Sequence, residues 1–386
     1  MRRRPYSSWA HRFGVARCFL RGAPVWCTWQ VTYRCPLRCQ FCDYWRRRVP
    51  RSEELSPADF ARGARNLGRL GSLFVSLAGG EPLVRSDLEE VIAAVARRHV
   101  TFMTTCGYGL SAERARALWE AGLWGASVSI DYADPQRHDA ARGRSGAFDH
   151  ALRALQHLSD TRNAWFQQVN LLVVLMHDNL DQLDRLAALA LDCRANLMVQ
   201  PYSPAKTGCD DFLPRAPVTR RLMALKRRWP NFLSTGWFLA RFDDYLNGGV
   251  PGCAAGVRFF NIDHHGRLSR CVEEMDHPVG SLLEEPIGTL LRRLRRRRSR
   301  ARDTRHPLPG IFPDCRACWY NCRGEVEALQ TVRGLLEELP TYLIGPWRSR
   351  WSSLPAAEGV GNPYGRFPKP YPSAWKNEAG PPGAGG

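Results

Sequence analysis

Between Trp26 and Ser203 the chain alternates six times between two kinds of segment. A run of β-branched, aromatic or aliphatic residues is followed each time by a longer segment with apolar residues at helical spacing. Alternating strands and helices of this kind form parallel sheets with right-handed crossovers. The sequence therefore predicts an α/β fold that curls into a partial (β/α)6 barrel of the TIM type, with its ligand site at the carboxyl ends of the strands.

The boundaries of the segments follow from the same pattern. We expect strands at residues 26–34, 73–78, 100–105, 125–131, 168–176 and 196–202. Helix start signals stand at Ser56, at Ser86 in a capping box with Glu89, and at Ser111 and Asn179.

Composition divides the chain into four parts. We expect a basic arm over residues 1–25, the barrel over residues 26–235, a small cysteine-rich domain over residues 236–330 and a tail over residues 331–386. The tail is rich in Pro and Gly and shows no apolar period, so we expect it to be largely disordered.

Thirteen cysteines in 386 residues indicate metal or redox chemistry rather than disulfide bridges. The count is odd, the chain is too long to need bridges, and no apolar stretch follows the N-terminal arginines to form a signal peptide. We therefore expect a reducing, cytoplasmic compartment, in which clustered thiols are often metal ligands. No apolar run approaches the length of about eighteen residues that a membrane-spanning helix needs.

The formal net charge of +18 is concentrated in the first 51 residues and in the arginine-rich segment 292–302. Such runs can attract nucleic acid, anionic lipid or a phosphorylated substrate, or can simply form a solvated face. The second run lacks interleaved stacking aromatics, which disfavours nucleic acid as a partner. In the first run, Phe13 and Leu20 fit either an amphipathic helix in peripheral contact with a membrane or a basic arm over the end of the barrel.

Three thiols, Cys35, Cys39 and Cys42, directly follow the first expected strand, with three residues between the first two and two residues between the last two. Arg38 and Gln40 lie between them, so the loop is polar rather than core-like. Three thiolates on one short loop suit a four-iron cluster that keeps one iron open for another ligand. A structural zinc site is the alternative, but it would need a fourth ligand nearby, and no His or Cys follows.

A Gly79-Gly80-Glu81-Pro82 turn follows the second expected strand. The two glycines allow the backbone to approach a ligand closely, and Glu81 can accept a hydrogen bond from an ammonium group. A plain turn with a helix-capping acid explains the same residues.

In this order, the cysteine loop, with Phe41 before its last thiol, and the Gly-Gly-Glu-Pro turn resemble the radical S-adenosylmethionine (SAM) superfamily. The resemblance implies that the three thiolates hold a 4Fe-4S cluster and that its open iron chelates SAM. It further implies that one electron, from a donor such as flavodoxin or ferredoxin, cleaves SAM to a 5′-deoxyadenosyl radical. The Gly-Gly-Glu-Pro turn would bind the amino group of the methionine moiety.

Two further matches to that superfamily are partial. Thr105 ends the third expected strand where the family usually has Thr-Asn-Gly, but Cys106 replaces the asparagine here. By the resemblance, Ser129 at the end of the fourth strand would bind the ribose or carboxylate of SAM, and Arg142 would reach the carboxylate. A strand-end cap at Ser129 and a surface charge at Arg142 are the alternatives.

The cysteine-rich region contains a second set of thiols. Twelve residues separate the first of them from Gly266, and four separate Gly266 from the second. The five thiols are Cys253, Cys271, Cys315, Cys318 and Cys322. Their spacing resembles the twitch/SPASM extension of radical SAM enzymes, which binds auxiliary 4Fe-4S clusters. Five thiols are too few for two clusters, so we expect one, held by the first four thiols, with Cys322 as a substitute or spare. A ribbon-like zinc site is the alternative.

The remaining cysteines and the histidines fit no ligand spacing. We expect Cys18, Cys27, Cys106, Cys193 and Cys209 to be small buried hydrophobes. His264 and His265 adjoin before Gly266, where a polar turn explains them.

The resemblance implies an enzyme that reductively cleaves SAM and abstracts a hydrogen atom from an unactivated carbon of a small molecule, a lipid or a peptide. One alternative is a maturation enzyme for a ribosomal peptide. Because the cluster loop begins at Cys35, we expect no room for an N-terminal leader-binding domain, so that enzyme would need a separate recognition partner. Another alternative is an iron-sulfur protein that transfers electrons or binds nucleic acid. An open iron argues against this alternative.

Overall fold

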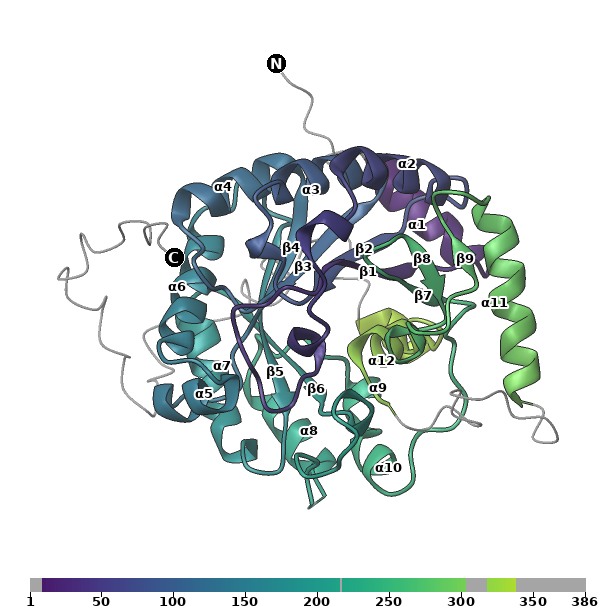
Figure 1. The fold of residues 1–386 in the computed structure, drawn as a ribbon. Helices are drawn as coiled ribbons and strands as arrows, with labels where there is room; N and C mark the ends of the chain where they lie inside the picture. The colour runs from purple at the N-terminus through teal and green to yellow at the C-terminus, as the bar shows by residue number, and fades with distance from the viewer. Residues whose placement is uncertain (1–8, 216, 303–317, 338–386) are drawn as a thin grey trace. The chain divides into compact units, whose positions relative to one another are not determined.

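A nine-stranded sheet forms the centre of the chain (Figure 1). The computed structural model describes residues 9–215, 217–302 and 318–337. The first six strands are β1 (Trp26–Thr32), β2 (Phe74–Gly79), β3 (Val100–Thr105), β4 (Leu123–Ser129), β5 (Gln168–Leu175) and β6 (Asn196–Pro201). Each pairs in parallel with the next. The predicted α/β fold with a partial barrel is confirmed. Each of these six strands begins and ends within two residues of its expected bounds.

Helices connect the parallel strands and lie outside them (Figure 1). They are α2 (Pro57–Leu67), α3 (Leu88–Ala96), α4 (Ala112–Ala121), α5 (Pro135–Arg142), α6 (Ala147–Asp160) and α7 (Leu183–Asp192). Short 3-10 helices lie at Tyr44–Arg46, Arg51–Glu53, Pro82–Val84, Leu180–Gln182, Pro204–Lys206 and Val272–Glu274. The helices bury apolar faces against the sheet, and its core residues, such as Trp29 and Leu77, are fully buried.

The helix start signals are partly confirmed. The Ser56 side chain accepts a hydrogen bond from the amide of Asp59 in a full capping box, and Ser111 caps α4. The expected capping box at Ser86 is wrong, because α3 begins one residue later than that box requires and Ser86 Oγ instead accepts a hydrogen bond from Arg51. Asn179 precedes a 3-10 helix, but its side chain bonds the ends of neighbouring strands rather than capping.

The cysteine-rich region extends the same sheet. It contributes β7 (Phe259–Ile262), β8 (Arg267–Ser269) and β9 (Gly280–Ser281). Strand β7 pairs in parallel with β1 on the side away from β2, and β8 and β9 follow in antiparallel order. Helix α8 (Thr219–Arg228) precedes this region, whose own helices are α9 (Gly236–Leu239), α10 (Phe242–Leu246), α11 (Ile287–Arg302) and α12 (Asn321–Ala328). Strand β1 is therefore shared by the barrel and the cysteine-rich region.

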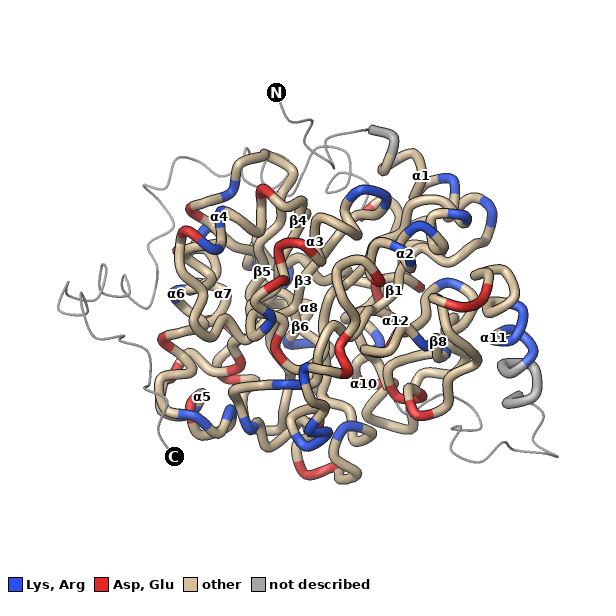
Figure 2. The backbone as a smooth tube through the Cα atoms, turned by 45° about the horizontal axis from the view of Figure 1, so that its top comes forward, with Lys and Arg blue, Asp and Glu red and all other residues tan. Residues whose placement is uncertain are grey.

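Both basic runs contain helices. The arginine-rich segment lies in α11, which buries Leu290 and Leu294 and exposes Arg292, Arg293, Arg295 and Arg296. Figure 2 shows basic residues on the described part of this helix. At the N-terminus, α1 (Trp9–Leu20) buries Val15 and Cys18 and leaves Phe13 and Leu20 exposed. The helix is thus docked on the barrel, and its predicted membrane contact stays a prediction. None of the helices in the described residues is long and apolar enough to cross a membrane.

The described chain continues into the segment predicted as a disordered tail. Residues 332–337 are helical, and Glu337 accepts a hydrogen bond from the amide of Gly236 at 2.6 Å. The rest of that predicted tail, residues 338–386, lies outside the described residues.

Replacing Gly63 by Ala should lower the melting temperature of the protein. A Cβ at Gly63, in α2, would lie 2.5 Å from Cη2 of the buried Trp29, and overpacking of this kind costs about 1–3 kcal/mol. Gly288→Ala in α11 is the matched control, because the nearest heavy atom would lie 3.8 Å away. Thermal unfolding followed by circular dichroism compares the two, and a Gly63→Ala protein that melts like Gly288→Ala would contradict the packing argument.

Candidate cluster and ligand site

The cysteine loop leaves β1 at the carboxyl edge of the parallel sheet. Its two apolar side chains, Leu37 and Phe41, are buried and pack with Tyr132, Met176 and Tyr202, which follow β4, β5 and β6. The loop backbone is also fastened to the end of α5, where the amides at positions 38 and 40 donate hydrogen bonds to carbonyl groups at positions 142 and 141. These contacts hold the loop across the mouth of the partial barrel.

The three loop thiols form a set of sulfur donors. Cys39 is buried, and Cys35 and Cys42 are half-buried. Burial raises the pKa of Cys35 to about 12 and that of Cys39 to about 11, and it also raises the pKa of Cys42. A metal centre would have to displace these protons, as thiolate ligation does. Clustered thiols on a constrained loop fit the donor set of a 4Fe-4S cluster.

Glu81 connects the end of β2 to the end of β3. Its carboxylate is 1% exposed and accepts hydrogen bonds from Thr105 Oγ1 at 2.6 Å, the Cys106 amide at 2.6 Å and the Leu83 amide at 2.9 Å. Burial raises the pKa of Glu81, and these hydrogen bonds oppose that rise. A carboxylate offers about four lone-pair positions, so one is left for a ligand. The structure therefore brings together Glu81 and Thr105, two of the candidate ligand residues.

The two glycines before Glu81 serve the protein's own backbone. A Cβ at Gly79 would lie 2.1 Å from the Thr32 carbonyl oxygen, and a Cβ at Gly80 would lie 2.3 Å from the Arg34 carbonyl oxygen. The amides of Gly80 and Glu81 donate to those same two oxygens, each at 2.8 Å. The glycines thus allow the turn to pack directly on the chain that leads into the cysteine loop.

Arg142 is buried beside the cysteine loop. It is 7% exposed, forms an ion pair with Asp131 at 2.6 Å, and lies over the Phe41 ring at 5.1 Å. Its Nη1 lies 3.9 Å from Cys39 Sγ. Asp131 raises the pKa of Arg142, although burial alone would lower it. The surface-charge alternative for Arg142 is therefore wrong.

The other predicted ligand residues lie at the same edge. Ser129 ends β4 and is half-buried, and Pro82 is buried at the start of a 3-10 helix. Cys106, expected to be a buried hydrophobe, is only partly buried and packs against the residue cluster that contains the loop thiols. Sequence spacing gave no signal for Cys106 or for Asp131, because their partners lie far away in the chain.

The second set of thiols surrounds one cavity. Cys253, Cys271, Cys318 and Cys322 line it together with Glu273 and Tyr320. Burial raises the pKa of Cys271 and of Cys322. Cys315 lies outside the described residues. Four of the five predicted thiols are thus brought together from segments far apart in the chain, including Cys322.

A half-buried lysine connects the two thiol sites. Lys206 Nζ donates to the hydroxyl of Tyr44 at 3.0 Å and lies 3.5 Å from Oε1 of Glu273. Tyr44 comes two residues after Cys42, and Glu273 comes two residues after Cys271. Burial alone would lower the pKa of Lys206, but Glu273 and Tyr44 raise it well above its ordinary value. The lysine therefore stays charged, and no sequence motif predicted it.

Comparison with known proteins gives three kinds of similarity, to a family model, to curated relatives and to a solved structure. A model of the radical SAM superfamily matches residues 29–190. The mycofactocin maturase MftC of Mycolicibacterium smegmatis is 34% identical over 286 residues, which cover 70% of this chain and 67% of that protein. Its namesake from Mycobacterium tuberculosis is 30% identical over 274 residues, with the same coverage. The crystal structure of Streptococcus suis SuiB bound to SAM matches 84% of this chain and 79% of SuiB with a TM-score of 0.60 at 17% identity, a similarity of fold.

Replacing Lys206 by Met should destabilise the protein by about 1–3 kcal/mol, because the largely enclosed Glu273 would lose its counterion. Adding Glu273→Gln should restore part of that loss, so the two changes should not be additive. Chemical denaturation of the metal-free protein measures the free energy of unfolding of the single and double variants. Arg62→Met, which breaks the exposed pair with Asp59, is the control and should change the free energy of unfolding by less than about 1 kcal/mol. If the losses of unfolding free energy in the two single variants added up to the loss in the double variant, the proposed coupling between Lys206 and Glu273 would be wrong.

Proposed function

The chain belongs to the radical SAM superfamily, and from this premise we propose that Cys35, Cys39 and Cys42 hold its SAM-binding 4Fe-4S cluster. An enzyme of this superfamily reductively cleaves SAM to a 5′-deoxyadenosyl radical and abstracts a hydrogen atom from an unactivated carbon of its substrate. The observation that carries the assignment is the meeting of three buried or half-buried thiols with Glu81 and Arg142 at one edge of the sheet.

The chain's own residues would position SAM. The Gly79–Pro82 turn is fastened to the start of the cysteine loop, so Glu81 is held in a set relation to the thiols. The unused lone pair of Glu81 would accept a hydrogen bond from the SAM ammonium, while Thr105 keeps the carboxylate oriented. We further propose that Ser129 and Arg142 face the ribose or carboxylate of SAM. An electron donor such as flavodoxin or ferredoxin would reduce the cluster.

We assign one auxiliary 4Fe-4S cluster to the second set of thiols. Its proposed ligands are Cys253, Cys271, Cys318 and Cys322, because these four line a single cavity. Four thiolates would complete a cluster with no open iron, which suits electron transfer rather than SAM binding. Cys315 remains a candidate to replace one of them, and a zinc site remains the alternative.

A peptide is the substrate class that we propose. The relatives at 34% and 30% identity are named mycofactocin maturases. SuiB, which shares the fold, has been crystallised with its precursor peptide SuiA. A small molecule or a lipid is the alternative substrate.

The experiment that tests this proposal is a coupled turnover assay. The reconstituted enzyme is incubated with SAM, dithionite and one of three substrate classes: the precursor peptide of mycofactocin, SuiA peptide, or a set of sugars and lipids. We expect 5′-deoxyadenosine to rise above the substrate-free level with a peptide, together with a mass change in that peptide. Stimulation by sugars or lipids alone would overturn the peptide proposal.

The two thiol sets can be separated by iron content. We expect about eight iron per chain after anaerobic reconstitution. Replacing Cys35, Cys39 and Cys42 by Ala should leave about four iron and abolish SAM cleavage. Replacing the four cavity thiols should also leave about four. Cys193→Ala is the control, because Cys193 lies at the end of α7 and should leave iron unchanged. If the loop variant still formed 5′-deoxyadenosine, the cluster assignment would be wrong.

Replacing Glu81 by Gln should weaken SAM binding by about ten- to a hundredfold, because a charge-assisted hydrogen bond to the ammonium is lost. The iron content should not change, since Glu81 is not a proposed iron ligand. Equilibrium dialysis with labelled SAM measures the affinity. The matched control is Glu120→Gln on the exposed face of α4. If the Glu81→Gln variant bound SAM as tightly as the wild-type protein, the Gly-Gly-Glu-Pro residues would form a plain turn with no part in SAM binding.

A further inference from the structure

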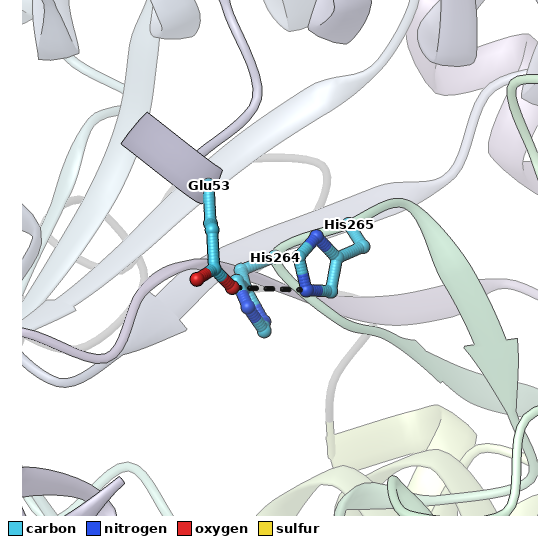
Figure 3. Close-up of side chains that lie close together, drawn as sticks. All are labelled: Glu53, His264 and His265. Atoms are coloured by element: carbon cyan, nitrogen blue, oxygen red, sulfur yellow. Dashed lines mark ion pairs between the residues drawn. The ribbon is translucent and has the colours of Figure 1, made fainter. Parts of the chain in front are cut away.

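A third group of potential metal ligands lies apart from both thiol sets. Glu53 ends a 3-10 helix after the cysteine loop, and His264 and His265 lie in the turn between β7 and β8. Figure 3 shows the three side chains facing one another. Each of the three side chains offers one ligand atom, and these atoms all lie within 4.8 Å of one another. His265 Nε2 is 3.7 Å from Glu53 Oε2. The adjacent histidines do form the predicted polar turn, but the turn alone does not explain why both rings meet a glutamate.

His264 is the unusual member of this group. Its side chain is 6% exposed, yet neither ring nitrogen has a hydrogen-bond partner among the described residues. Buried polar groups nearly always have partners, and an unsatisfied one costs about 1–3 kcal/mol. An imidazole nitrogen without a hydrogen-bond partner has a lone pair that a metal ion can take up. The Tyr33 ring meets the imidazole at a centroid distance of 4.8 Å in a T-shaped contact and leaves both nitrogens unbonded.

The arginines near Glu53 pair with other carboxylates, so Glu53 is available to bind a metal ion. Glu54 next to it is taken up by Arg34 at 2.8 Å and Arg85 at 3.4 Å, and Asp263 is taken up by Arg267 at 2.7 Å. Among the described ion pairs, Glu53 takes part only in the one with His265. Its side chain is half exposed and can therefore move toward a bound ion.

We propose that Glu53, His264 and His265 bind one borderline divalent cation such as Zn²⁺. Imidazole nitrogens and one carboxylate oxygen are ligands that Zn²⁺ accepts at about 2.0–2.2 Å. Bringing the three ligand atoms to such distances from one ion needs small movements of Glu53 and of the half-buried His265. Three protein ligands leave one coordination position open for water or an oxygen of a substrate, as in zinc sites that take part in chemistry.

The proposed cation site lies at the same edge of the sheet as the mouth of the partial barrel. Strand β7 runs parallel to β1, so the turn that carries His264 leaves the sheet at the same edge as the cysteine loop. Tyr33, which contacts His264, comes two residues before Cys35. A bound cation would therefore lie on the same edge of the sheet as the proposed SAM site, but with nitrogen and oxygen ligands instead of sulfur.

Zinc K-edge absorption on the cluster-loaded protein tests the proposal. Reconstitution occupies the thiols, one equivalent of Zn²⁺ is then added, and unbound metal is removed by desalting. We expect about one zinc per chain with a nitrogen and oxygen shell near 2.0–2.1 Å and without the sulfur shell near 2.3 Å. Absence of bound zinc, or a shell of sulfur alone, would overturn the proposal. Iron content, measured in the same sample, reports separately whether the proposed clusters formed.

Single substitutions locate the zinc. Glu53→Gln and His264→Ala should each weaken zinc binding at least tenfold and leave the iron content unchanged, which also shows that the variants fold. Glu53 is exposed, so its variant should fold even if the buried His264 position does not tolerate change. Glu120→Gln on α4 and His157→Ala on α6 are the matched controls and should bind zinc like the parent protein. Wild-type zinc affinity in the Glu53 variant would contradict the site.

Discussion

The turn after β2 packs on the exit of β1 so closely that no side chain fits between them, and the arrangement of the site depends on this contact. The amides of Gly80 and Glu81 bond the carbonyl groups of Thr32 and Arg34, and a Cβ on either glycine would overlap those groups. The Glu81 carboxylate is held relative to the cysteine loop by backbone atoms, which are stiffer than side chains. A ligand that contacts both Glu81 and the cysteine loop would meet groups that are already held in place. The protein would then lose little conformational freedom on binding, which favours affinity.

Buried and half-buried ion pairs fix the remaining parts of the site. Arg142 pairs with Asp131 beneath the cysteine loop, Arg85 pairs with Glu54, and Lys206 joins Tyr44 to Glu273. Such pairs contribute little net stability, because desolvation offsets the attraction, but removing one partner is costly. Their effect is therefore to penalise alternative placements of the loops.

The fold could be predicted from the sequence because its signals are local. The six parallel strands appear as short β-branched and aromatic runs, and the helices between them carry their own period. Strand β7 was not predicted, since it is four residues long and its pairing with β1 joins segments far apart in the chain. The expected cap at Ser86 failed because α3 begins at Leu88 and the serine hydroxyl accepts a hydrogen bond from Arg51, which lies far away in the chain.

The candidate site could be predicted where its residues belong to short motifs or to spacings that resemble those of a known family. The loop thiols and Glu81 belong to short motifs, whereas Asp131, Lys206 and the group of Glu53 with two histidines are assembled by folding. Strand β1 explains why these assembled residues still share one edge: β2 lies on one side of it and brings Glu81, and β7 lies on the other and brings His264. Because both neighbours run parallel to β1, all three chains leave the sheet in the same direction. One strand thus places the proposed sulfur ligands, the proposed SAM-binding acid and the proposed cation site at one edge of the sheet.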